Sequence, residues 1–168
     1  MAKIFFPSCQ NKIAYPNASE KLREYLIASY GVEIIAGCCR SEYSKLSSED
    51  TAIVICNTCF ACCKKLSNVG NIIYVWEIID SDNKFPFPSY NGEKITVQDC
   101  WRTIGRNDIH NAVRSLLKKM DLEPIELDEN RDKSRFCGGI TAYMQQPVQH
   151  TDLAPVRNGT DRTRVSNI

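Results

Sequence analysis

The chain has 168 residues, of which 43% are hydrophobic, and a formal net charge of +1. Its length and apolar content allow one ordinary core or two small ones. A charge so close to zero gives no electrostatic reason to expect nucleic acid or an acidic membrane surface as a partner. No run approaches the roughly 18 apolar residues that a membrane span requires, and the apolar start of the chain, which Pro7 interrupts, is shorter than a secretory signal. We therefore expect a cytoplasmic protein.

In the first half of the chain, short apolar runs alternate with helical patterns. The predicted strands are residues 3–9, 32–37, 51–56 and 71–76, the last of which runs on to residue 80. Asn17 and Glu20 have the spacing of a capping box at the start of a helix, and Gly31 is a suitable residue to end it. Residues 41–50 should form a loop or a short helix, and a further helix is expected to begin within 59–67.

Residues 81–93 contain prolines and a glycine and are typical of a linker. After this linker the strand–helix–strand order starts again. The predicted elements are a strand at 94–99, a helix at 108–120 and a strand at 124–128. The helix has the clearest periodicity in the chain, with an apolar stripe formed by Ile109, Ala112, Val113, Leu116, Leu117 and Met120. His110 falls on the polar face of this helix, where we expect it to be solvated.

The two halves repeat one unit: a strand followed by a cysteine, a helix, and a second strand followed by cysteine. Strand–helix–strand order implies right-handed crossovers and a parallel sheet in each half. We therefore predict an α/β protein of two similar small halves, the second of them truncated. The predicted domains are a first cysteine-rich half at 1–80, the linker at 81–93, a second, incomplete half at 94–144, and a flexible polar tail at 145–168.

Nine cysteines carry the main functional signal of the sequence. An odd number cannot close completely into internal disulfides, and thiols stay reduced in the cytoplasm. The cysteines at or near the ends of predicted strands are Cys9, Cys38, Cys39, Cys56, Cys59 and Cys100. Open α/β sheets bind ligands beyond the carboxyl ends of their strands, so these thiols should be directed at one place. Such a cluster suits a soft metal centre, iron–sulfur before zinc. Cys62 and Cys63, taken singly, are expected to be small core residues.

The cysteines form two ordered sets along the chain. In the first half these are Cys9, Cys38-Cys39-Arg40 and Cys56-x-x-Cys59. In the second half they are Cys100 and Phe136-Cys137-Gly138-Gly139. This pattern resembles the cysteine-rich CCG-domain family, whose best-known member is the CCG-domain subunit of heterodisulfide reductase. The family motif is one cysteine, then Cys-Cys-Gly, then Cys-x-x-Cys, usually in two copies. Here Arg40 replaces the first glycine, Phe136 replaces a paired cysteine, and the second Cys-x-x-Cys is absent.

The resemblance implies an iron–sulfur redox protein in electron transfer or disulfide reduction, as one component of a heterodisulfide reductase-like oxidoreductase. In such proteins an unusual, non-cubane 4Fe–4S cluster exchanges single electrons with a partner protein and can engage a disulfide substrate. The implied ligands are Cys9, Cys38, Cys39, Cys56 and Cys59, with Cys100 and Cys137 as further candidates for cofactor binding. The incomplete second set implies that the two-cluster arrangement of the family is not formed. The sequence identifies no catalytic residue.

Two other interpretations stay open. Four of the cysteines would suffice for a zinc ion, which would make the chain a structural or interaction protein without redox turnover. A C-x-x-C motif that follows a strand and begins a helix is also typical of thioredoxin-like dithiols. Cys56 and Cys59 would then form a dithiol oxidoreductase, but the thiols at the other strand ends would be unexplained.

Overall fold

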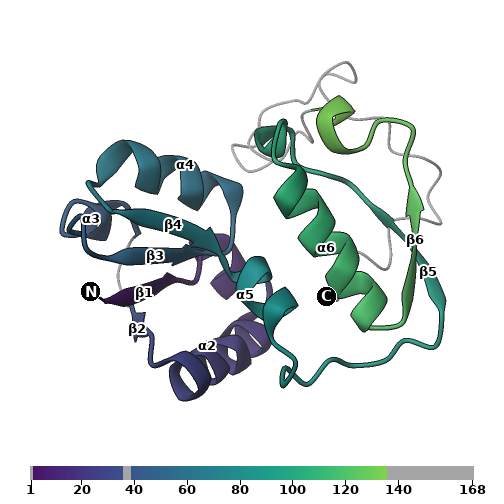
Figure 1. Ribbon diagram of the computed structural model, residues 1–168, viewed down its shortest axis with the longest axis horizontal. Coiled ribbons are helices and arrows are strands. Elements are labelled where there is room, and N and C mark those ends of the chain that lie inside the picture. Colours follow the sequence, from purple (N-terminus) through teal and green to yellow (C-terminus); the bar gives the residue numbers. More distant parts are fainter. Residues whose placement is uncertain (1, 36–38, 136–168) are drawn as a thin grey trace. The chain divides into compact units, whose positions relative to one another are not determined.

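The structure is a computed structural model that describes residues 2–35 and 39–135 (Figure 1). The predicted features that lie outside the described residues are the end of the strand at 32–37, Cys38, the side chain of Cys39, the end of the second half including Cys137, and the tail at 145–168. The chain forms two compact units, Met1–Ile78 and Ile79–Ile168. Each unit has parallel strands connected through helices, which confirms the predicted α/β class.

The first unit is built around a four-stranded parallel sheet with the strand order β2-β1-β3-β4. The strands are β1 (Lys3–Phe6), β2 (Glu33–Ile34), β3 (Thr51–Val54) and β4 (Asn71–Tyr74). β1 and β3 lie at the centre of the sheet. Their fully buried residues include Phe5, Phe6, Ile53 and Val54. Central parallel strands are covered on both faces, which explains why their sequences are almost continuously apolar.

The helices that begin in the first unit are α1 (Cys9–Ala14), α2 (Pro16–Tyr30), α3 (Cys39–Tyr43), α4 (Asn57–Leu66) and α5 (Val75–Ser81), which ends in the second unit. α2 connects β1 to β2, and α4 connects β3 to β4. These connections run in opposite directions along the sheet, so right-handed crossovers place the two helices on opposite faces. α1 packs against α2, and α3 packs against α4.

Each strand of the first unit ends before its predicted last residue. β1 ends at Phe6, because Pro7 has no backbone N–H to donate to the ladder and α1 begins at Cys9. β4 ends at Tyr74, whose N–H donates to the Glu77 side chain at 2.8 Å where α5 begins. In both places a helix begins within a stretch that was predicted to be strand.

One predicted end of α2 is confirmed and the other is wrong. Gly31 ends the helix in the left-handed conformation, with φ 61°, and donates its N–H to a carbonyl one turn earlier at 3.0 Å. The helix begins at Pro16, because proline suits the first helical position. The capping box predicted at Asn17 is therefore not formed, and Glu20 instead makes an ion pair with Arg23.

Gly70, in the loop between α4 and β4, has no room for a side chain. A Cβ atom there would lie 2.1 Å from the carbonyl oxygen of Ser48. We expect Gly70→Ala to lower the free energy of unfolding by about 1–3 kcal/mol, because the backbone must move to make room. Urea unfolding measures this loss, with Asn68→Ala at an exposed position of the same loop as the control. A loss no larger than that of the control would contradict the close approach.

The second unit is a parallel strand pair with one long helix. Its strands and helix are β5 (Glu93–Val97), α6 (Asn107–Lys119) and β6 (Leu122–Glu126). Short 3-10 turns follow the two strands: η1 (Trp101–Thr103) and η2 (Arg131–Lys133). Figure 1 shows α6 lying along the strand pair. The apolar stripe predicted for α6 is confirmed, since Leu117 and Met120 are buried in one core cluster with Ile95 and Leu122.

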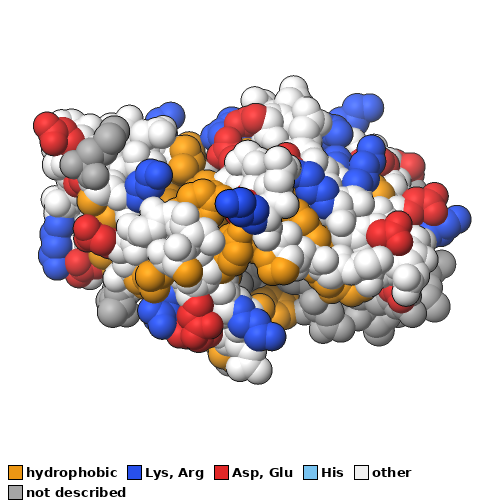
Figure 2. Space-filling model, turned by 60° about the horizontal axis from the view of Figure 1, so that its bottom comes forward, with side chains coloured by type: hydrophobic (Ala, Val, Ile, Leu, Met, Phe, Trp, Pro, Cys, Tyr) orange, Lys and Arg blue, Asp and Glu red, His pale blue; other side chains and the backbone are white. Residues whose placement is uncertain are grey.

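The surface carries charges of both signs. On the face drawn in Figure 2, Lys and Arg side chains lie among Asp and Glu side chains and do not form one large patch of a single sign. This mixture agrees with the formal net charge of +1. In the part of the chain that the structure describes, no helix combines the length and the apolar character needed to cross a membrane.

Candidate metal centre

The sheet of the first unit brings three cysteine-bearing segments to one edge. β1 pairs with β2 on one side and with β3 on the other, and all three strands are parallel. The chain therefore leaves all three strands at the same edge of the sheet. Cys9 follows β1, Cys39 follows β2 and Cys56 follows β3. The parallel order of the strands thus directs these three segments away from the same end of the sheet.

The boundary between β1 and β3 is the switch point of this sheet. After β1 the chain adds β2 on one side, and it later adds β3 and β4 on the other. The connections that leave β1 and β3 therefore diverge, and open α/β sheets bind ligands in the crevice that forms at such a point. Ser8, which follows β1, lies close enough to Cys56, which follows β3, for its side chain to lower the pKa of the Cys56 thiol.

Cys56 is the N-cap residue of α4, and its sulfur accepts a hydrogen bond from the Cys59 N–H at 3.3 Å. A hydrogen bond from the Cys59 side chain is the largest cause that lowers the pKa of Cys56 to about 6, although burial opposes the shift. The N–H groups of Cys59 and Thr58 and the Ser8 hydroxyl lower this pKa further. Cysteines at helix N-termini are stabilised as thiolates in the same way. Cys56 is therefore mainly a thiolate at neutral pH.

Ser8 has an uncommon backbone conformation between β1 and α1. Its φ of 63° is rare for a residue other than glycine, and the residue is buried. Its carbonyl accepts the Lys12 N–H at 3.1 Å, which fixes the first turn of α1. Strain of this kind persists where surrounding contacts enforce it, often at functional sites. Sequence reasoning missed Ser8, because the residue fell within the strand predicted at 3–9.

The first turn of α4, which carries the C-x-x-C motif, is fixed against β4. The Phe60 ring stacks on the Tyr74 ring, with centroids 5.1 Å apart and an interplanar angle of 8°. The Tyr74 hydroxyl donates a hydrogen bond to the Asn57 side chain at 2.7 Å. These contacts hold Cys56 and Cys59 in place from the side of β4.

The other cysteines of α4 differ in their burial. Cys63 is fully buried, and its sulfur lies 3.6 Å from the Ser67 hydroxyl. It therefore occupies the core position that was predicted for it. Cys62 is half-buried, which is less than a core residue requires.

The pH dependence of alkylation should distinguish Cys56 from an ordinary cysteine. In the metal-free chain, the rate of its reaction with iodoacetamide should rise through pH 6 and then level off, because the thiolate is the reactive form and the pKa is about 6. An ordinary thiol continues to gain reactivity up to its pKa of about 8.5. Ser8→Ala removes one of the side chains that lower this pKa, so it should move the midpoint to higher pH. Peptide mass spectrometry measures both profiles, and a wild-type midpoint near that of an ordinary thiol would contradict the assignment.

In the second unit, Cys100 lies in a loop that a buried network of ion pairs holds in place. Asp99, immediately before it, accepts hydrogen bonds from Arg114 at 2.8 and 2.7 Å. Arg114 also donates two hydrogen bonds of 2.7 Å to Glu126 at the end of β6. The Arg131 N–H donates to Asp99 at 2.8 Å. The loop of Cys100 and the segment after β6 are therefore fixed to α6 by one network, which sequence reasoning missed.

The prediction that His110 is solvated was wrong. The residue is 1% exposed, and its Nε2 atom lies 2.9 Å from the Thr103 hydroxyl. That hydroxyl donates to the Cys100 carbonyl at 2.6 Å, so the His110 Nε2–H is the donor to Thr103. η1 packs against this side of α6 and buries a position that the helical periodicity assigned to solvent.

Three of the predicted ligands are thiols in the described part of the first unit: Cys9, Cys56 and Cys59. Cys9 is exposed, Cys56 is half-buried and Cys59 is buried. Cys100, also a thiol, belongs to the second unit. Within residues 2–35 and 39–135, no three side chains of His, Cys, Asp or Glu are grouped closely enough to hold a metal ion. The predicted ligand set is not complete within those residues, because Cys38 and the Cys39 side chain lie outside them.

The chain has no match among known protein families, curated proteins or solved structures. Its function is therefore inferred from the residues and the geometry of this edge of the sheet.

Proposed function

We propose that the chain is an iron–sulfur protein, similar to the CCG-domain subunit of heterodisulfide reductase, that acts in electron transfer or disulfide reduction. The strand order β2-β1-β3 carries this proposal, because it delivers the segments of Cys39, Cys9 and Cys56 to one edge of the sheet. Iron–sulfur clusters are held by cysteine thiolates that such an edge can supply. The proposed ligands are Cys9, Cys38, Cys39, Cys56 and Cys59, with Cys100 and Cys137 as further candidates.

The donor chemistry of the described residues fits such a cluster. Metal ligation requires deprotonated cysteine, and Cys56 has a pKa of about 6 without any metal. Several thiolates together select a soft centre, such as an iron–sulfur cluster or zinc, over magnesium or calcium. A bound cluster would supply single-electron exchange.

The chain's own residues would orient the ligands and tune the site. The Cys59 N–H donates a hydrogen bond to the Cys56 sulfur, and the nearby Ser8 side chain favours its thiolate form. Hydrogen bonds to sulfur are one of the factors that set cluster potentials. The stacked rings of Phe60 and Tyr74 would limit access of water from the side of β4. Because about four thiolates saturate a cluster, a fifth would remain to react with a disulfide.

A cytoplasmic location would keep these thiols reduced between turnovers. Single-electron chemistry also requires a partner protein that delivers the electrons. The resemblance to the CCG-domain family implies such a partner and a disulfide as the substrate.

Anaerobic purification followed by analysis of iron, zinc and acid-labile sulfide tests the proposal. We expect iron and sulfide in near-equal amounts and the broad visible absorbance of an iron–sulfur cluster. A colourless protein that holds zinc without sulfide would contradict the proposal and support a structural zinc site. A chain that takes up neither metal after reconstitution would contradict both.

A dithiol oxidoreductase is the second candidate, and the hydrogen-bonded pair of Cys56 and Cys59 favours it. The Cys56 thiolate would attack a disulfide, form a mixed disulfide and release one thiol. Cys59, after losing its proton, would then attack Cys56, close the internal disulfide and release the second thiol. In this case the metal-free chain would reduce a small disulfide, and Cys59→Ser would accumulate the mixed disulfide. Failure of the wild-type chain to react would exclude this candidate.

A further inference from the structure

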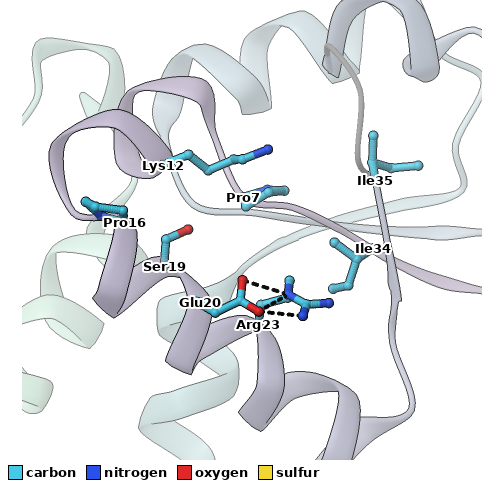
Figure 3. A pocket seen from close by; sticks show the side chains of 8 residues that line it. All are labelled: Pro7, Lys12, Pro16, Ser19, Glu20, Arg23, Ile34 and Ile35. Carbon is cyan, nitrogen blue, oxygen red and sulfur yellow. Dashed lines mark hydrogen bonds and ion pairs between the residues drawn. The ribbon is translucent and has the colours of Figure 1, made fainter.

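A cavity of about 470 Å³ lies in the first unit between α1, α2 and the end of β2 (Figure 3). Its volume falls in the range of small-molecule sites, about 300–1,000 Å³. Part of its wall is apolar and is formed by Pro7, which follows β1, and by Ile34 and Ile35 at the end of β2. The cavity therefore lies at the edge of the sheet from which the cysteine-bearing segments leave, on the side of α2.

Three charged side chains line the same cavity. Arg23 donates from Nε to both carboxylate oxygens of Glu20 at 3.0 Å, so these two charges offset each other. The hydrogen bond from Arg23 also lowers the pKa of Glu20, which keeps it ionised at neutral pH. No ion pair of the described residues includes Lys12. The ammonium group of Lys12 thus gives the cavity one net positive charge.

The positions of these groups favour a ligand with a single negative charge. Figure 3 shows Lys12 extending along one side of the cavity, the pair of Glu20 and Arg23 on the other, and Pro7 between them. A monoanion would place its charge near Lys12 and its apolar part on Pro7 and Ile34. A dianion such as phosphate would carry more charge than Lys12 offsets and would be repelled by the Glu20 carboxylate.

We propose that this cavity binds a small organic monoanion, a carboxylate with an apolar body, through Lys12. This binding goes beyond the iron–sulfur function and does not require a bound cluster. A ligand in the cavity lies beside the segment that carries Cys9, because Pro7 and Lys12 flank that residue in the chain.

Isothermal titration calorimetry of the metal-free full chain tests the proposal with phenylacetate and with its uncharged analogue phenylacetamide. Phenylacetate should bind at least about tenfold more tightly than the amide, because only the carboxylate makes a charge-assisted hydrogen bond. Lys12→Met should abolish this preference, and Lys65→Met, at another exposed position of the first unit, should leave it unchanged. Ile34→Trp should fill the cavity and weaken the binding of both probes.

Three results would overturn the proposal: no binding of phenylacetate, equal affinity for the two probes, or an unchanged preference in Lys12→Met. Lys12 is exposed, so its substitution should not prevent folding, and circular dichroism of the variant checks this. All measurements use metal-free protein, so their failure would leave the iron–sulfur proposal unaffected.

Discussion

Replacement of Arg114 by methionine should destabilise the second unit by about 3–5 kcal/mol, because it leaves a buried carboxylate without its counter-ion. The side chains of Arg114 and Asp99 are only 6% and 4% exposed. Burial opposes the charge of Asp99, but hydrogen bonds from Arg114 and the Arg131 N–H outweigh it and lower its pKa. Methionine retains much of the apolar stem of arginine, so the loss reports mainly the missing charge. Urea unfolding measures the effect, and hydrogen exchange of the α6 amides assigns it to this unit.

Arg106→Met is the matched control for this substitution. Arg106 pairs with Asp108 at 2.7 Å, but the two side chains are 33% and 50% exposed. Exposed pairs contribute about 0–1 kcal/mol, so the control should lose far less stability. Addition of Asp99→Asn to Arg114→Met should recover part of the loss, because the unpaired buried charge is removed. A loss in Arg114→Met no larger than in Arg106→Met would show that the network does not fix the Cys100 loop.

Cys56→Ser should remove most of the iron that the anaerobically purified chain contains. The serine oxygen can still accept the hydrogen bond from the Cys59 N–H, because serine is a favoured N-cap residue. The substitution therefore preserves the start of α4 while it removes the thiolate that the site supplies. Iron and sulfide analysis, normalised to protein that circular dichroism shows to be folded, measures the loss.

Cys62→Ser is the control within the same helix. Cys62 is half-buried and is not one of the proposed ligands, so iron content should be unchanged. Loss of iron in Cys62→Ser with retention in Cys56→Ser would overturn the ligand assignment. Equal retention in both variants would place the metal elsewhere.

The features that the sequence predicted best are those that depend only on residues close together in the chain. The stripe of α6 follows from spacing within a single helix, and the end of α2 follows from one glycine that can adopt a positive φ. The start of α2 could not be located in the same way. The capping-box spacing placed that start at Asn17, but the helix begins at Pro16.

Some features of the candidate site could likewise be predicted from the sequence, and others could not. The approach of the segments of Cys9 and Cys56 could be predicted, because parallel strands end at a common edge. The position of the Ser8 hydroxyl could not be predicted, because it depends on a positive φ angle, which serine rarely adopts. The pairing of Arg114 with Asp99 was also hidden, since it joins side chains that are fifteen positions apart and from different elements.

Alkylation of Cys9 in the metal-free and the iron–sulfur-loaded chain tests most directly whether thiols from separate strands share one cluster. Cys9 is exposed without a metal, so its thiol is accessible to alkylation in that form, and a bond from its sulfur to a cluster would protect it. We predict that iodoacetamide labelling, quantified by peptide mass spectrometry, falls together at Cys9 and Cys56 when the cluster is bound and stays constant at Cys62. Equal labelling of Cys9 in the two forms would contradict the convergence of these segments on a metal.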